Sequence, residues 1–84
     1  MYLHLGKDIV VRQSSVVAVF DLDNASQSHI TRDYLRMAQL EGRVVSVGEE
    51  LPKSFVVCAD ETGQTVYLSQ LASSTLLKRT ALFR

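Results

Sequence analysis

Residues 54–69 decide the fold; they read Ser54-Phe55-Val56-Val57-Cys58-Ala59-Asp60-Glu61-Thr62-Gly63-Gln64-Thr65-Val66-Tyr67-Leu68-Ser69. Two apolar segments, 54–59 and 65–69, flank the polar stretch 60–64. Runs rich in β-branched and aromatic residues that are bounded by turn residues are typical of strands. Because glycine adopts the left-handed conformation that tight hairpins need, we predict a β-hairpin with Gly63 at that position.

Residues 15–22, which read SVVAVFDL, predict another strand upstream. Successive side chains of a strand point to opposite faces, so alternate residues share a face. The face expected in the core consists of Val16, Ala18, Phe20 and Leu22. The other face begins with Val17 and Val19, and we expect it to be partly covered. Shorter extended segments are predicted at 2–5, 9–12 and 43–47.

Residues 29–41 change to the helical period of about 3.6. The apolar stripe contains Ile30, Tyr34, Met37 and Ala38, with Leu35 and Leu40 at its flanks. Gly42 follows at the point where glycine commonly ends a helix. Residues 73–75 offer caps for a second, short helix. The sequence therefore predicts one α+β domain over residues 1–84, with a small, mostly antiparallel sheet, one main helix and a short C-terminal helix.

Size and charge limit the possible functions. A chain of 84 residues has a thin core, yet 46% of its residues are hydrophobic. Subunits that share buried surface overcome this limit, so we expect a homo-oligomer. The nine basic and nine acidic residues balance. Zero net charge argues against a simple basic nucleic-acid binder, unless the charges are segregated onto different faces.

The compartment expected for this protein is the cytoplasm. The N-terminal residues lack a basic segment followed by an apolar one, and no apolar run approaches the ~18 residues that span a bilayer. The single cysteine, Cys58, lies in an apolar run and is expected to be a buried, reduced thiol.

Residues for catalysis or metal binding are not evident. His4 and His29 are expected in a strand and at a helix start, without a nucleophile or metal-type spacing beside them. The four glycines are scattered singly, so they form no phosphate-binding loop. We therefore expect no enzyme activity, no metal and no cofactor.

Arginines on the main helix form the most suggestive charged pattern. Arg32 and Arg36 are four residues apart, and Arg43 lies eleven after Arg32. If the helix runs that far, these three residues and Gln39 line up opposite the apolar stripe, where guanidinium groups can bind phosphates. The alternative is an ordinary solvated face, since Asp33 and Glu41 dilute the charge.

The remaining cations have plainer interpretations. Lys78 and Arg79, with Arg84 at the chain end, are expected to stabilise the C-terminal helix through its dipole. Lys53 follows Pro52 at a strand entrance, but Glu49 and Glu50 precede it.

Several segments in order resemble the RemA/RemB family of bacterial extracellular-matrix regulators, especially its RemB branch, over roughly residues 2–80. The segments are YLHLG at 2–6, VVAVFD at 16–21, PKSFVV at 52–57, YLS at 67–69 and SSTLLKR at 73–79. The resemblance implies a small α+β subunit, a closed ring, and arginines around the ring that contact the DNA backbone. It also implies a regulator of biofilm-matrix genes.

Two DNA-contacting regions of that family can be placed on this chain through the resemblance. The family's arginine pair falls in the loop before Ser54, where only Lys53 is cationic. Another family arginine falls on or near Ser15, and Arg12 is the closest cation. The leading hypothesis is therefore a ring-forming regulator that binds double-stranded DNA in the cytoplasm. Its candidate residues are Arg32, Arg36, Arg43, Lys53 and Arg12. The alternative is an oligomeric protein-interaction module that binds another protein and no DNA.

Overall fold

The computed structural model describes residues 2–22 and 29–79. Along the chain, the elements are β1 (Tyr2–Gly6), β2 (Ile9–Arg12), a short 3-10 turn η1 (Gln13–Ser15), β3 (Val16–Asp21), α2 (His29–Leu40), β4 (Val44–Ser46), β5 (Ser54–Asp60), β6 (Gly63–Ser69) and α3 (Ser73–Arg79). The predicted α+β class, with a main helix and a short C-terminal helix, is confirmed.

The main sheet has four strands in the order β3-β5-β6-β4, and β1 and β2 form a separate antiparallel pair. The predicted hairpin is present, with register pairs running from Ser54 and Ser69 to Asp60 and Gly63. Gly63 has the expected positive φ, of 126°. The turn is shorter than predicted because the Asp60 carboxylate accepts hydrogen bonds from the N–H and the hydroxyl of Thr62. The same bonds lower the pKa of Asp60. β4 pairs with β6 in parallel, so the sheet is mixed.

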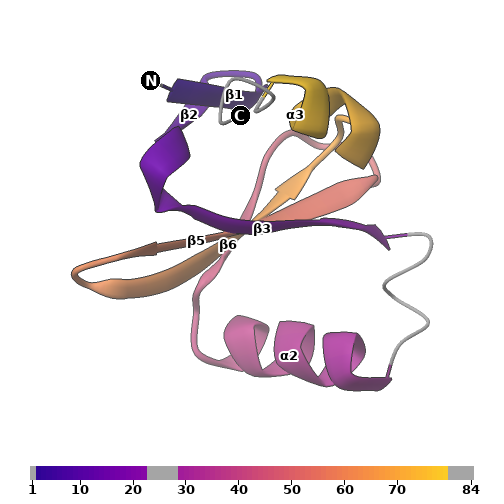
Figure 1. Ribbon diagram of the computed structural model, residues 1–84. Helices are drawn as coiled ribbons and strands as arrows, with labels where there is room; N and C mark the ends of the chain where they lie inside the picture. Colours follow the sequence, from indigo (N-terminus) through magenta and orange to yellow (C-terminus); the bar gives the residue numbers. More distant parts are fainter. Residues whose placement is uncertain (1, 23–28, 80–84) are drawn as a thin grey trace.

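Both faces of this sheet are covered, which gives three layers (Figure 1). The β1–β2 hairpin and α3 lie on one face, and α2 lies on the other. The buried cluster under the hairpin and α3 consists of Leu3, Leu5, Val11, Val47, Val56, Cys58 and Leu76. The cluster under α2 consists of Ala38, Phe55, Val57 and Val66. Cys58 is buried as expected, and burial raises the pKa of its thiol.

A bulge changes the expected alternation along β3. Val16 pairs with Cys58 while Ala18 pairs with the next residue, Val57, so Val17 has no direct partner on β5. A bulge inserts one residue and shifts which side chains share a face. Val16 therefore packs on the hairpin side together with Val19. The prediction that Val16 shares a core face with Ala18, Phe20 and Leu22 is wrong.

The predicted apolar stripe of α2 is narrower than expected. Tyr34, Leu35 and Ala38 face the sheet, whereas Met37 is exposed and Leu40 is 80% exposed. Ile30, the other member of the predicted stripe, lies outside the described side chains. No helix in residues 2–22 and 29–79 is both long enough and apolar enough to span a membrane.

The two stacked phenylalanines should differ in their contribution to stability. The ring centroids of Phe20 and Phe55 are 4.7 Å apart, but Phe55 is 1% exposed and Phe20 is 38% exposed. We expect Phe55→Ala to lower the free energy of unfolding by about 3–5 kcal/mol, as loss of a buried aromatic usually does. Phe20→Ala should cost clearly less because water already reaches its ring. Urea denaturation of both variants tests this, and equal losses would contradict the difference in burial.

Candidate nucleic-acid interface

The end of α2 determines which arginines lie on its surface. The helix ends at Leu40, and Gly42 adopts a φ of +71°. The Arg43 N–H donates to the Ala38 carbonyl, and the Gly42 N–H donates to the Gln39 carbonyl. These two bonds form a Schellman motif, which ends a helix with a left-handed glycine. Gly42 is therefore the predicted helix stop, and Arg43 lies beyond the helix.

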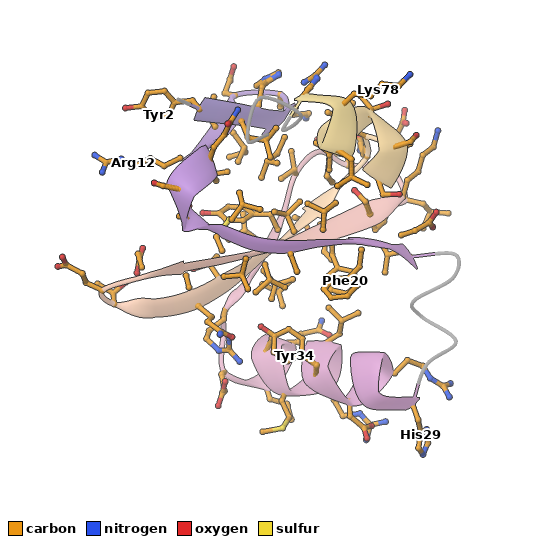
Figure 2. All side chains as sticks on the ribbon, in the orientation of Figure 1. Tyr2, Arg12, Phe20, His29, Tyr34 and Lys78 are labelled. Carbon is orange, nitrogen blue, oxygen red and sulfur yellow. The ribbon has the colours of Figure 1, made fainter. Side chains whose placement is uncertain are left out.

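Arg32 and Arg36 remain as an exposed pair on α2. Residues four apart lie on the same side of a helix, so the two guanidinium groups can act together. Gln39 and the acidic Asp33 are also exposed on the same helix. Tyr34 on the same helix points towards the sheet, which fixes the outward direction of the arginine side (Figure 2).

Arg43 does not continue this stripe, because its side chain turns back towards the sheet. One terminal nitrogen lies 2.6 Å from Glu41 Oε1, and the Nε donates to the same oxygen. The guanidinium also lies over the Tyr34 ring, 5.9 Å from the centroid. Its interactions with Tyr34 and Glu41 raise the pKa of Arg43. The side chain is half-buried and its charge is matched by a carboxylate, so it is a poor phosphate ligand.

Arg12 and Lys53 lie elsewhere on the molecule. Arg12 is exposed at the end of β2, on the opposite side of the main sheet from α2 (Figure 2). Lys53 is exposed at the entrance to β5. Its backbone is held there because its N–H donates to Ser69 and its carbonyl accepts from Leu22. Of the five predicted cations, the structure brings only Arg32 and Arg36 together.

The sequence did not predict that a second set of cations shares one layer of the fold. Lys7, Arg12, Lys78 and Arg79 all belong to the layer formed by the β1–β2 hairpin and α3. Arg12 and Lys78 lie at opposite ends of this layer (Figure 2). Lys78 and Arg79 do occupy the last turn of α3, as a dipole-stabilising role requires. They share a layer with residues 7 and 12 because of tertiary packing, so no sequence spacing reveals it.

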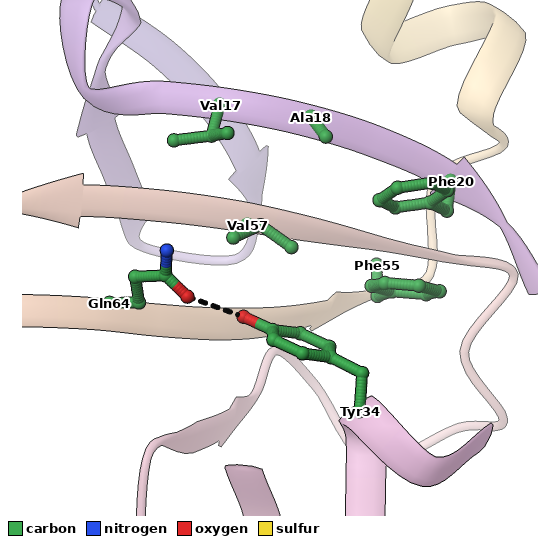
Figure 3. A pocket seen from close by; sticks show the side chains of 7 residues that line it. All are labelled: Val17, Ala18, Phe20, Tyr34, Phe55, Val57 and Gln64. Carbon is green, nitrogen blue, oxygen red and sulfur yellow. Dashed lines mark hydrogen bonds between the residues drawn. The ribbon is translucent and has the colours of Figure 1, made fainter. Parts of the chain in front are cut away.

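An apolar hollow of about 290 Å³ lies between β3 and α2. It is lined by Val17, Ala18, Phe20, Tyr34, Phe55, Val57 and Gln64 (Figure 3). At its rim the Tyr34 hydroxyl donates to Gln64 Oε1 over 2.9 Å. The hollow opens beside β3, an edge strand of the sheet, where Val17 is exposed. This region offers apolar contact surface rather than charge.

Ionisable groups that could support other chemistry are dispersed in the described residues. No three histidine, cysteine, aspartate or glutamate side chains of residues 2–22 and 29–79 are placed to hold a metal ion. His4 lies in β1, where its Nε2 is 2.6 Å from the Lys7 carbonyl oxygen. His29 is exposed at the start of α2. Both occupy the local settings that their sequence contexts predict.

Comparison with known proteins identifies the family. Residues 2–80 match the model of the RemA-like family, described as "Extracellular matrix regulatory protein A-like". Extracellular matrix regulatory protein B of Bacillus subtilis (strain 168) is 42% identical over 79 residues, which cover 94% of this chain and 89% of that protein. The chain therefore belongs to the RemA-like family, and the predicted likeness to its RemB branch is confirmed.

The left-handed end of α2 gives a testable consequence. No atom lies within 4 Å of a Cβ built on Gly42, so a substitution there meets only backbone strain. We expect Gly42→Ala to lower the free energy of unfolding by about 1–2 kcal/mol, the cost of a left-handed alanine. Gly42→Asn should cost less because asparagine tolerates this conformation. Equal unfolding midpoints for the wild type and Gly42→Ala would contradict this geometry.

Proposed function

We propose that this protein is a cytoplasmic, DNA-binding transcriptional regulator of biofilm-matrix genes that acts as a homo-oligomeric ring. The observation that carries the proposal is its 42% identity, over nearly the whole chain, to a protein named as an extracellular matrix regulatory protein. In this proposal, the ring presents cations of its subunits to the DNA backbone.

The exposed arginine pair supports the DNA-binding part of the proposal. Arg32 and Arg36 lie on the solvent side of α2, and neither is paired with a carboxylate among the described residues. Guanidinium groups bind phosphate oxygens with two parallel hydrogen bonds. A ring repeats the pair in every subunit, so a modest local charge becomes a continuous series of phosphate contacts.

The exposed apolar surface supports self-association. β3 has a strand neighbour on one side only, and Val17 is exposed beside the apolar hollow. Edge strands and apolar patches are places where another chain can add. A neighbouring subunit that covers the hollow would supply the burial that a chain of 84 residues lacks.

The second candidate function is an oligomeric protein-interaction module without DNA binding. In its favour, the loop before β5 presents exposed Glu49 and Glu50 where the resemblance implies an arginine pair. Leu51 in the same loop is almost fully exposed. An acidic loop with an exposed apolar residue is better suited to contact another protein than to contact DNA phosphates.

The salt dependence of DNA binding separates the two candidates. Fluorescence anisotropy of a labelled duplex is measured against protein concentration at several salt concentrations. A phosphate-binding oligomer should lose affinity linearly in log salt, with a slope of about −0.9 for each phosphate neutralised. Absence of binding even at low salt would overturn the DNA-binding proposal and leave the interaction module.

The arginine pair of α2 can be tested by the same titration. We expect Arg32→Ala combined with Arg36→Ala to weaken binding and to reduce the salt slope by about one for each lost phosphate contact. Size-exclusion chromatography with light scattering should show an unchanged oligomer, because both side chains point into solvent. Unchanged affinity in this variant would show that α2 does not face DNA.

A further inference from the structure

Charge is distributed unevenly between the layers of the molecule. The hairpin–α3 layer is defined here as β1, the turn at residues 7–8, β2, η1 and α3. It contains one acidic residue, Asp8, and four basic residues: Lys7, Arg12, Lys78 and Arg79. All five are exposed. This layer therefore has a strongly positive formal charge although the chain as a whole is neutral.

The rest of the described chain has the opposite balance. Its basic residues are Arg32, Arg36, Arg43 and Lys53, and its acidic residues are Asp21, Asp33, Glu41, Glu49, Glu50, Asp60 and Glu61. A polyanion that approaches the molecule is attracted to the hairpin–α3 layer and repelled by most of the remaining surface. The net charge of the chain is zero, but its basic and acidic residues are distributed unevenly between the layers.

The cations of the layer are available for a ligand. Among the described residues, none of the four is paired with a carboxylate. The Arg79 guanidinium is held at the edge of β1, because one terminal nitrogen donates to the His4 carbonyl over 3.0 Å. A single hydrogen bond leaves most of the five N–H donors of an arginine free. Arg12 lies opposite Tyr2 in the register of the hairpin, and Tyr2 is 65% exposed.

The packing that assembles this layer also fixes its geometry. The Gln13 amide is within 3.4 Å of the carbonyl oxygens of both Tyr2 and Arg79, so η1 connects β1 to the end of α3. Leu76 is completely buried under the layer together with Leu3 and Leu5. Cations from the two ends of the sequence are therefore presented on one rigid support, and little ordering entropy is lost when a ligand binds.

We propose that the hairpin–α3 layer is a second phosphate-binding surface for double-stranded DNA, separate from the arginine pair of α2. The inference rests on the proposed DNA-binding function and assigns it a surface on the opposite side of the main sheet (Figure 2). The layer contains four basic residues and one acidic residue, so its formal charge is more positive than that of the α2 surface, where Arg32 and Arg36 flank Asp33. Outside the layer, the acidic Asp60 lines a hollow together with Arg12. A layer with this charge is the type of patch by which a neutral chain can bind DNA.

A gain-of-affinity experiment tests the layer directly. Asp8→Asn removes its only acidic side chain, and Glu61→Gln removes another exposed acid, in the turn between β5 and β6 and outside the layer. Both variants change the net charge by one unit. We expect Asp8→Asn to tighten duplex binding roughly threefold or more at low salt, and Glu61→Gln, which lies outside the layer, to tighten it clearly less. Equal effects of the two substitutions would overturn the proposal, because net charge alone would then govern binding.

Loss of cations gives the complementary test. Arg12→Ala combined with Lys78→Ala removes two exposed side chains that form no ion pair within the described residues. We expect weaker binding and a salt slope reduced by about one per lost contact. A fourfold variant that also carries Arg32→Ala and Arg36→Ala should lose affinity by the product of the two separate fold-changes. Independent surfaces contribute additively to the binding free energy.

The outcomes separate this inference from the function on which it rests. Binding by the wild type that survives unchanged in the Arg12→Ala, Lys78→Ala variant would overturn the second surface but leave DNA binding in place. Absence of wild-type binding would overturn both. Simultaneous loss of DNA binding and of the oligomer in light scattering would also overturn direct contact, because the layer would then bind a neighbouring subunit.

Discussion

Burial of β5 on both faces is the constraint on which the rest of the structure depends. Ser54, Phe55, Val56, Val57 and Cys58 are all buried in succession. Alternate side chains of a strand point in opposite directions, so such a run requires a cover on each face. Phe55 and Val57 enter the cluster beneath α2, and Val56 and Cys58 enter the cluster beneath the hairpin and α3. A two-layer arrangement would leave half of this strand in water.

Two buried serines fix the position of the hairpin–α3 layer over the main sheet. Ser54 and Ser69 are paired in register at the end of the β5–β6 hairpin, and both are fully buried. The Ser69 hydroxyl donates to the Leu5 carbonyl and the Ser54 hydroxyl donates to the Leu71 carbonyl. Because an unpaired buried hydroxyl is costly, β1 and the segment entering α3 must remain over this end of the sheet. Apolar packing alone would allow the hairpin–α3 layer to slide over the sheet, whereas these directional hydrogen bonds fix its position.

Local signals in the sequence were sufficient for most of the elements. The hairpin at 54–69 and the stop at Gly42 follow from turn and capping chemistry that acts within a few residues. The bulge at Val17 was not predictable, because nothing in a run of β-branched residues shows where the pairing register slips. The exposure of Met37 and Leu40 was also not predictable. Periodicity identifies the apolar side of a helix but does not show how far the sheet extends beneath it.

The candidate site was less predictable than the fold for a related reason. Arg32 and Arg36 are neighbours through helical geometry, which the sequence specifies, whereas Arg43 depends on how the helix ends. The Schellman motif turns its backbone, and Glu41 and Tyr34 then hold its side chain. The hairpin–α3 cations come from residues 7–12 and 78–79, which approach one another only because β5 needs a second cover. The demand for burial on both faces of one strand therefore also separates the charges, since it folds the basic ends of the described chain onto one side of an otherwise acidic molecule.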